Sequence, residues 1–188
     1  MTALDRFIQN YRIDKARPFI AKGARVLDLG SADGVLFARH GQCGPGSMGI
    51  DPVLPSNTQT AQGFTLVRGY FPGDLPANAG PFDAIVMLAV LEHFPDDQTT
   101  ALADGIAKFL RPGGRLIITV PSPAVDQILD VLVKLRLVHG MSLEEHHGFD
   151  VNNTPKIFGE PRFRLIKRGT FQLGLNNLFV FERMGAGD

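Results

Sequence analysis

Two aspartates lie at positions where they could contact a small ligand. Asp28 lies in the run VLDLG and Asp51 closes the run SMGID, so each falls near the end of a short apolar segment. If both segments are parallel strands, the two carboxylates lie at the edge where such sheets bind ligands. A carboxylate there attracts a cation and repels phosphate groups. We therefore predict a site for a ligand that carries positive charge and no phosphate.

The loop after Asp28 contains glycines that allow a ligand to approach closely. Gly30 and Gly34 have no Cβ, so the backbone can lie directly against a bound molecule. The fingerprint of dinucleotide-binding loops is absent, because the third and sixth positions counted from Gly30 are Ala32 and Val35. The loop therefore argues against a nicotinamide dinucleotide.

A simpler interpretation of the same residues stays open. Asp28 and Asp33 can cap the following helix, and Asp51-Pro52 can form an ordinary turn. However, Asp51 ends its segment twenty-one positions after Gly30. That placement suits a carboxylate that accepts hydrogen bonds from both hydroxyls of a ribose. The joint placement of these residues favours a binding site over a turn.

Histidines are the candidates for proton transfer. His93 follows the fourth predicted strand directly, at the mouth of the same sheet edge, and is a candidate general base. The alternative is that His93 forms local hydrogen bonds and shapes its loop. Glu92 is interpreted as a structural partner of that loop.

The segment MSLEEHHGFD at 141–150 holds four more polar side chains, Glu144, Glu145, His146 and His147. In one interpretation His146 or His147 binds a substrate or acts as a base, and in another the segment is a solvated loop with one histidine packed beneath it. Histidine and glutamate are also metal ligands. Adjacent histidines usually diverge, and no HxxxH or CxxC spacing is present, so we predict no metal site.

Apolar segments and helical patterns alternate along the chain. Helical spacing marks the first twenty residues, with an apolar stripe at Leu4, Phe7, Ile8 and Tyr11. A second helical pattern runs through Leu102, Ile106, Phe109 and Leu110 and stops at Pro112-Gly113-Gly114. A third helix is predicted over about 123–138, with Ser122 as its N-cap. The predicted strands cover about 24–30, 47–51, 64–70, 82–90, 114–120, 162–168 and 176–183.

This alternation predicts an α/β protein with a doubly wound, Rossmann-like sheet covered by helices on both faces. The sheet is expected to have seven strands, mostly parallel, with an antiparallel edge strand, because the connection between the last two strands is too short for a helical crossover. We expect one domain over 1–188. Within it, 1–22 forms a helical cap, 24–122 the ligand-binding core, and 123–188 the second side of the site.

The charge balance argues against a polyanionic partner. Nineteen basic and nineteen acidic residues cancel, so no overall field attracts nucleic acid or an anionic membrane. The only basic cluster comprises Arg162, Arg164, Lys167 and Arg168. We interpret it as a solvated strand edge, with the three arginines on one face of the strand.

The remaining composition indicates a cytoplasmic protein. Cys43 is the single cysteine and cannot form an internal disulfide. The N-terminus lacks the apolar stretch of a signal peptide, and no segment approaches the roughly 20 apolar residues of a membrane span. We expect a monomer or a homodimer. The helix at 123–138 is apolar on more than one face, which suits core packing, an apolar substrate or a second subunit.

Together the motifs resemble those of the class I S-adenosylmethionine-dependent methyltransferases, in the branch with Leu-Glu-His after the fourth strand. The segments that carry the resemblance are VLDLGSADG, GIDPV, FDAIVMLAVLEHF and LRPGGRLIITVPSP, which span about 24–123. The resemblance implies that S-adenosylmethionine is the cofactor. It also implies which residues line the cofactor cleft: Asp28, Gly30, Ser31, Gly34, Asp51, Pro52, Tyr70, Phe71, Leu88 and Ala89.

Two positions depart from the family pattern. Ala32 stands where the family usually has glycine. Gly69 is followed by Tyr70 and Phe71 where the family often has an aspartate that reaches the adenine amino group. Adenine recognition would then rest on a backbone amide and aromatic packing, or on Asp74. The fourth strand ends in LAVLEH and not in Asn-Pro-Pro-Tyr, which argues against a methyltransferase of DNA adenine.

The expected function is therefore transfer of a methyl group from S-adenosylmethionine to a small-molecule acceptor. One alternative is a non-catalytic protein that keeps the fold and binds the cofactor or a partner. A nicotinamide-dependent oxidoreductase is a third possibility, and the missing fingerprint and Asp28 argue against it. The sequence does not identify the acceptor.

Overall fold

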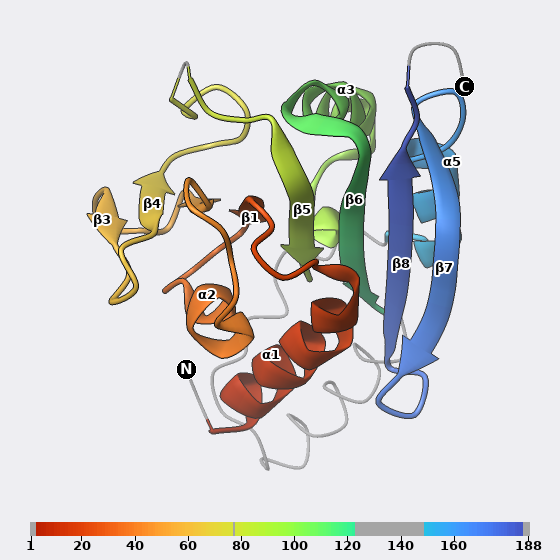
Figure 1. Cartoon of the computed structure of the whole chain (residues 1–188). Helices are drawn as coiled ribbons and strands as arrows, with labels where there is room; N and C mark the ends of the chain where they lie inside the picture. Colours follow the sequence, from red (N-terminus) through yellow and green to blue (C-terminus); the bar gives the residue numbers. More distant parts are fainter. Residues whose placement is uncertain (1–2, 77, 123–148, 186–188) are drawn as a thin grey trace.

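One mixed sheet organises the computed structural model, which describes residues 3–76, 78–122 and 149–185 (Figure 1). The strand order is β3-β4-β2-β1-β5-β6-β8-β7. The strands are β1 (Val26–Leu29), β2 (Met48–Asp51), β3 (Thr58–Gln59), β4 (Thr65–Arg68), β5 (Phe82–Leu88), β6 (Leu110–Pro121), β7 (Phe163–Phe171) and β8 (Asn176–Arg183). The central strands pair in parallel, and β6, β8 and β7 pair antiparallel.

The predicted fold class is confirmed, with one more strand than expected. All seven predicted strands are present, and the last two pair antiparallel as expected. The eighth strand, β3, pairs antiparallel with β4 at the other edge of the sheet. It has only two residues, both exposed, so it has no alternation of apolar and polar residues to predict it from.

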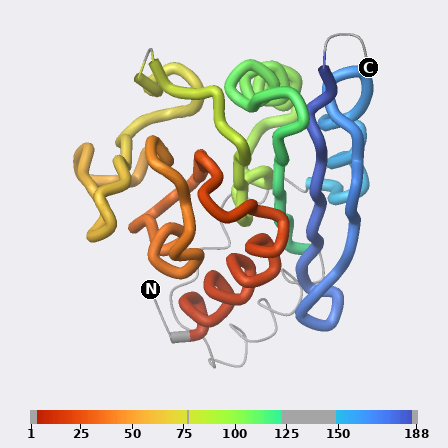
Figure 2. Tube along the Cα trace, viewed as in Figure 1, coloured from red at the N-terminus to blue at the C-terminus, as the bar shows by residue number. Residues whose placement is uncertain are grey.

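Helices cover both faces of the sheet. Alternate residues of each strand point to opposite faces and belong to two separate hydrophobic cores. On one face α1 (Ala3–Ala16), a 3-10 turn (Arg17–Phe19) and α2 (Val35–His40) pack on a core that contains Ile13, Val26 and Phe37. On the other face α3 (Thr99–Phe109) and α5 (Thr154–Ile157) pack on a core that contains Leu27, Ile106 and Phe158. The trace in Figure 2 shows α1 and α2 side by side on their face.

Only part of the apolar stripe predicted for α1 contacts the core. Leu4 and Phe7 are exposed, whereas Ile13 and Ala16 are almost wholly buried. The apolar stripe at the start of the helix overhangs the sheet, and only the second half of α1 reaches the core. Tyr11, the last member of the stripe, packs against the core, and Ile13 and Ala16 form a buried face that the predicted stripe did not include.

The basic strand β7 also differs from the prediction. Its register against β8 shifts between Leu165 and Lys167, so Arg164 pairs with Glu182 and Arg168 pairs with Phe179. Positions 179 and 182 of a strand point to opposite faces. The prediction that all three arginines share one face is therefore wrong, since the bulge turns Arg168 to the other side.

One predicted helix boundary needs a similar correction, and a second is not tested by the described residues. Helix α3 ends at Phe109, before Pro112, and β6 begins at Leu110, so the predicted stop lies inside a strand. The hydroxyl of Ser122 donates to the Gly174 carbonyl oxygen. The helix that Ser122 was expected to cap, over 123–138, lies outside the described residues.

Candidate functional site

Asp28 sits in the centre of the sheet, on the face covered by α1 and α2. It lies between Gly49 of β2 and Val86 of β5, and it shares a face with Val26 because strand residues alternate. The side chain is only 5% exposed. Burial, followed by the negative charge of Asp51, raises the pKa of Asp28 to about 8. A cation that paired with Asp28 would favour its ionised form.

The loop after β1 is held against the end of β2 by backbone hydrogen bonds. The Gly30 and Ser31 amides both donate to the Ile50 carbonyl oxygen, at 2.9 Å and 3.3 Å. Gly30 has a φ of +74°, and a Cβ built there would lie 2.4 Å from Val90 Cγ2. Glycine is therefore required at this position on two grounds, backbone conformation and space.

Asp51 clamps the same loop from the end of β2. Its Oδ2 accepts a hydrogen bond from the Ala32 amide at 2.8 Å, and its Oδ1 accepts one from the Val53 amide at 2.9 Å. Ala32 has a φ of +43°, which is uncommon for a residue with a Cβ. The carboxylate thus stabilises the strained position where the family usually has glycine. Each oxygen keeps a second lone pair for a ligand.

Ser31 places an unsatisfied polar group in this loop. Its side chain is 3% exposed, and its hydroxyl has no hydrogen-bond partner among the residues that the structure describes. A Cβ built on Gly49 would lie 2.4 Å from Ser31 Cβ, so glycine is what lets the two segments approach. A buried hydroxyl without a partner is unusual in proteins and suits a ligand group that completes it.

The end of β5 supplies the neighbouring wall. Ala89 follows Leu88 with a φ of +58°, and its amide donates to the Thr119 carbonyl oxygen at 2.9 Å. A 3-10 turn (Leu91–His93) comes next. Glu92 in this turn is buried, whereas His93 is exposed. Strained backbone in non-glycine residues thus occurs in both loops, after β1 and after β5, which is typical of binding sites.

The sequence interpretation missed Arg12 of α1. Its Nε donates to Asn176 Oδ1 at 3.0 Å, at the end where β8 pairs with the last residues of β6. Its Nη atoms form no hydrogen bond to any described residue. Burial lowers the pKa of Arg12, and the charge of Glu92 partly offsets that shift. Ala16, four residues later, is fully buried, so a predicted stripe that included Ala16 would have placed Arg12 on the inner face.

The family of the chain follows from comparison with known proteins. The methyltransferase domain family matches residues 4–154, which include β1, β2, β5 and the loops just described. The chain belongs to this methyltransferase domain family. This result confirms the resemblance to the class I S-adenosylmethionine-dependent methyltransferases. The narrower branch, marked by Leu-Glu-His, stays a prediction.

Curated relatives of this methyltransferase domain are ubiquinone biosynthesis O-methyltransferases. The one from Xanthomonas axonopodis pv. citri is 35% identical over 105 residues, which cover 52% of this chain and 43% of that protein. The one from Vibrio cholerae serotype O1 is 27% identical over 150 residues, which cover 74% of this chain and 60% of that protein. The chain thus spans about half the length of the curated relatives it matches.

Solved methyltransferase structures share the fold. Magnesium protoporphyrin IX methyltransferase from Synechocystis PCC 6803, with bound S-adenosylhomocysteine, has a TM-score of 0.64 at 20% identity and covers 95% of this chain and 84% of its own. The N-methyltransferase NodS from Bradyrhizobium japonicum has a TM-score of 0.61 at 17% identity and covers 96% of this chain and 99% of its own. At these identities the likeness concerns the fold.

The two aromatic residues predicted to contact adenine, Tyr70 and Phe71, have different surroundings in this methyltransferase domain. The Phe71 ring packs against Phe109 of α3, with ring centroids 5.7 Å apart. The Tyr70 side chain is exposed, and its amide donates to Asp74 Oδ2 at 2.7 Å. Since Phe71 is used in packing, Tyr70 is the aromatic residue whose ring remains available to a ligand.

The structure describes only part of 123–188, the segment predicted to form the second side of the site. His146 and His147 lie outside the described residues, as do Glu144 and Glu145. Within residues 3–76, 78–122 and 149–185, no group of three or more histidine, cysteine or acidic side chains could hold a metal. No helix in that part of the chain is long and apolar enough to cross a membrane.

Proposed function

We propose that this chain transfers a methyl group from S-adenosylmethionine to a small-molecule acceptor. The observation that carries the proposal is the buried Asp28 carboxyl, which lies beside the Asp51 clamp and whose pKa is raised by burial and by the charge of Asp51. Membership of the methyltransferase domain family supports it. So do the relatives named as O-methyltransferases and a solved neighbour that holds S-adenosylhomocysteine.

The charges of the site match the methionyl end of this cofactor. Its ammonium would pair with Asp28, and its carboxylate with the unengaged Nη atoms of Arg12. The second lone pairs of the Asp51 carboxylate oxygens would accept hydrogen bonds from the ribose hydroxyls. The unsatisfied Ser31 hydroxyl and the backbone of Gly30 and Gly34 would lie along the same end, with Pro52, Tyr70, Leu88 and Ala89 along the rest of the cleft.

The chain's own part in the reaction is to bind and orient. S-adenosylmethionine supplies a methyl group on a sulfonium, which departs as a neutral thioether and needs no acid. The loops after β1 and β5 would place the acceptor in line with that bond, and positioning of this kind can account for much of the rate. A base is needed only if the acceptor must lose a proton. His93 is the described candidate, and His146 and His147 are the others.

Calorimetric titration of the purified protein tests the cofactor proposal. S-adenosylmethionine and S-adenosylhomocysteine should bind with affinities tighter than millimolar, and NAD should not bind. Asp51→Ala should weaken both sulfur ligands by roughly tenfold or more, because a charge-assisted hydrogen bond is worth about 1.5–3 kcal/mol. Circular dichroism checks that the variant is folded. If neither S-adenosylmethionine nor S-adenosylhomocysteine bound, the proposal would be refuted.

Turnover separates an enzyme from a non-catalytic binder. Protein that binds the cofactor should form S-adenosylhomocysteine when incubated with S-adenosylmethionine and a panel of small hydroxyl, amine and thiol acceptors. Binding without turnover across that panel would favour the non-catalytic alternative. The cytoplasmic location, the monomer or homodimer state and the lack of a nucleic-acid partner remain predictions.

A further inference from the structure

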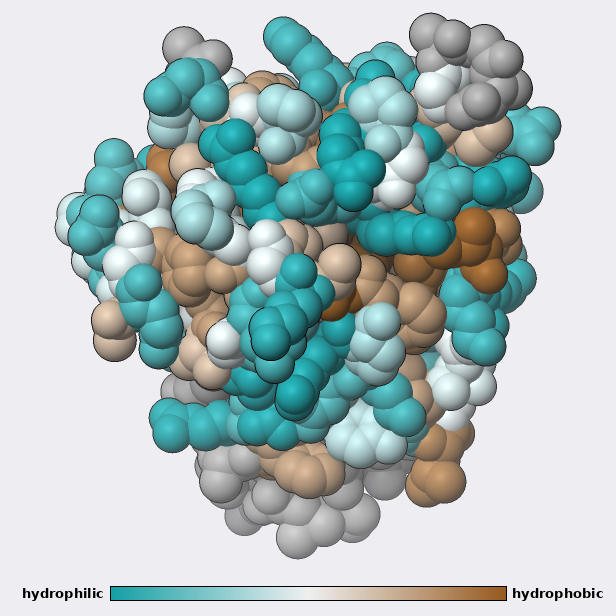
Figure 3. Space-filling model, in the orientation of Figure 1, coloured by the Kyte–Doolittle hydropathy of each residue, from teal (hydrophilic) through white to brown (hydrophobic). Residues whose placement is uncertain are grey.

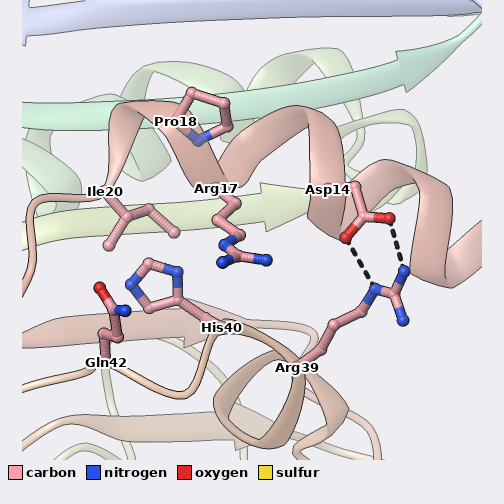
Figure 4. Close-up of a pocket in the computed structure, with 7 residues that line it drawn as sticks. All are labelled: Asp14, Arg17, Pro18, Ile20, Arg39, His40 and Gln42. Atoms are coloured by element: carbon pink, nitrogen blue, oxygen red, sulfur yellow. Dashed lines mark hydrogen bonds and ion pairs between the residues drawn. The ribbon is translucent and has the colours of Figure 1, made fainter.

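A pocket lies between the C-terminal ends of α1 and α2, and no residue of the loop after β1 is among its lining residues. It has a volume of about 610 Å³. Its floor borders the start of β1, where the Gly23 amide donates to the Gln42 carbonyl oxygen at 2.7 Å, whereas the cofactor loop follows the other end of that strand. The lining residues are Asp14, Arg17, Pro18, Ile20, Arg39, His40 and Gln42 (Figure 4).

His40 is the unusual residue of this pocket. It is the last residue of α2 and is only 5% exposed, yet neither ring nitrogen has a hydrogen-bond partner among the described residues. Figure 4 shows its ring with the Arg17 side chain on one side and Gln42 on the other. Burial and then the nearby charge of Arg17 lower the pKa of His40. The neutral ring has one N–H donor and one acceptor, both unused.

The charges around His40 do not cancel. Arg39 binds Asp14 through two hydrogen bonds, at 2.8 Å and 2.5 Å, and the charge of Arg17 acts on Asp14 more weakly, so two guanidinium groups face one carboxylate. Arg17 is exposed and forms no side-chain hydrogen bond or ion pair with any described residue. One guanidinium is therefore left over at the pocket. In Figure 3 hydrophilic side chains gather over α1 and α2, around this place.

We propose that this pocket binds the oxyanion group, a phosphate or a carboxylate, of a small molecule. Arg17 supplies the positive charge and can form two parallel hydrogen bonds to such a group. His40 donates its ring N–H, and the Gln42 amide adds a third donor. Pro18 and Ile20 form an apolar wall for the rest of the molecule. Arg17 and Gln42 are exposed, so they can move off the ring as the oxyanion enters.

Nuclear magnetic resonance of the His40 ring provides the test. The full protein is titrated with inorganic phosphate, and in a second arm with succinate, each against sodium chloride of equal ionic strength. The His40 resonances should shift to saturation in at least one arm. The pKa of His40 should rise, because a bound anion stabilises the imidazolium and opposes Arg17, while Asp14 stays paired with Arg39. The arm that responds identifies the group.

Two arginine variants make the test specific. Arg17→Gln should abolish the saturable shift, whereas Arg6→Gln, an exposed arginine of α1 outside the pocket, should leave it unchanged. Thermal unfolding checks that both variants fold like the parent. The proposal is wrong if neither anion moves the His40 resonances beyond the chloride control, as expected for a ring that binds only water. It is equally wrong if Arg17→Gln responds like the parent.

Discussion

Asp28 and His40 are both buried ionisable side chains, yet their surroundings differ. Burial raises the pKa of Asp28 and lowers that of His40, so in each case it favours the neutral form. Asp28 lies in a central strand, beside a loop fixed by backbone hydrogen bonds and by Asp51. His40 lies at a helix end, between the exposed residues Arg17 and Gln42.

The difference shows two ways of preparing a binding site. Around Asp28 the backbone itself forms the cradle, and the strained residues Ala32 and Ala89 show that its shape is imposed. Around His40 the donors are side chains that can rearrange. Substitutions in the first region should therefore have large effects on affinity or stability, and substitutions in the second should act only on a ligand bound there.

The largest effect is expected from Asp28→Asn. Loss of the charge should weaken S-adenosylhomocysteine by roughly 10- to 100-fold, because a hydrogen bond to a charged group is worth about 1.5–3 kcal/mol. Asp33→Asn, in the same loop but exposed, is the matched control and should bind normally. Calorimetry measures both. Equal losses in the two variants would mean that the loop, and not the buried charge, selects the ligand.

The same variant has a second consequence for the free protein. The pKa of Asp28 is raised from 3.8 to about 8 on folding, so the folded state holds an extra proton between these pH values. The contribution of Asp28 to the free energy of unfolding is fully present below about pH 4, and it is lost as the pH rises to about 8. The free energy of unfolding of Asp28→Asn should not fall in this way between about pH 4 and pH 8. Urea unfolding at pH 5 and pH 8.5 measures the difference.

Arg12→Gln should weaken S-adenosylhomocysteine by about tenfold, in line with the loss of one charged hydrogen bond. The ligand 5′-methylthioadenosine lacks the carboxylate, so its affinity should not change. Arg6→Gln, on the exposed side of α1, controls for the general loss of a positive charge. If Arg12→Gln weakened both ligands alike, Arg12 would be a structural residue and not a carboxylate partner.

Gly30→Ala should destabilise the fold by about 1–3 kcal/mol more than Gly63→Ala. Both glycines have positive φ, but a Cβ at Gly30 would collide with Val90, and one at Gly63 would meet nothing within 4 Å. Urea unfolding of Gly30→Ala, Val90→Ala and the double variant gives the coupling between the two sites. A coupling near zero would show that the loop after β1 adapts, against the rigid cradle inferred here.

The sheet and the loop after β1 could be predicted from sequence because their causes are local. Buried strands appear as short apolar runs, and Gly30 and Asp51 fall at the ends of two of them. The short link between the last two strands was enough to predict their antiparallel pairing. Such features follow from chain length, hydrophobicity and backbone geometry without any knowledge of partners.

What could not be predicted depends on contacts between distant segments. Arg12 comes next to Asn176 only because α1 packs with its second half on the sheet. The bulge that separates Arg164 from Arg168 arises from pairing with β8. His40 is at the end of a short helix, and it lines a pocket with residues of η1, the turn at Arg17–Phe19, and with Gln42. Periodicity in one segment carries no information about these contacts.

The central claim is that an ionised Asp28 selects a cofactor with a positive charge. The most direct test is the affinity for S-adenosylhomocysteine from pH 6 to pH 9, measured by calorimetry in the parent protein and in Asp28→Asn. Because the carboxyl must lose its proton to pair with the ammonium, the parent's affinity should rise by about tenfold per pH unit up to about pH 8 and then level. Asp28→Asn should show no such rise. A flat profile in the parent, or the same profile in both proteins, would contradict the claim.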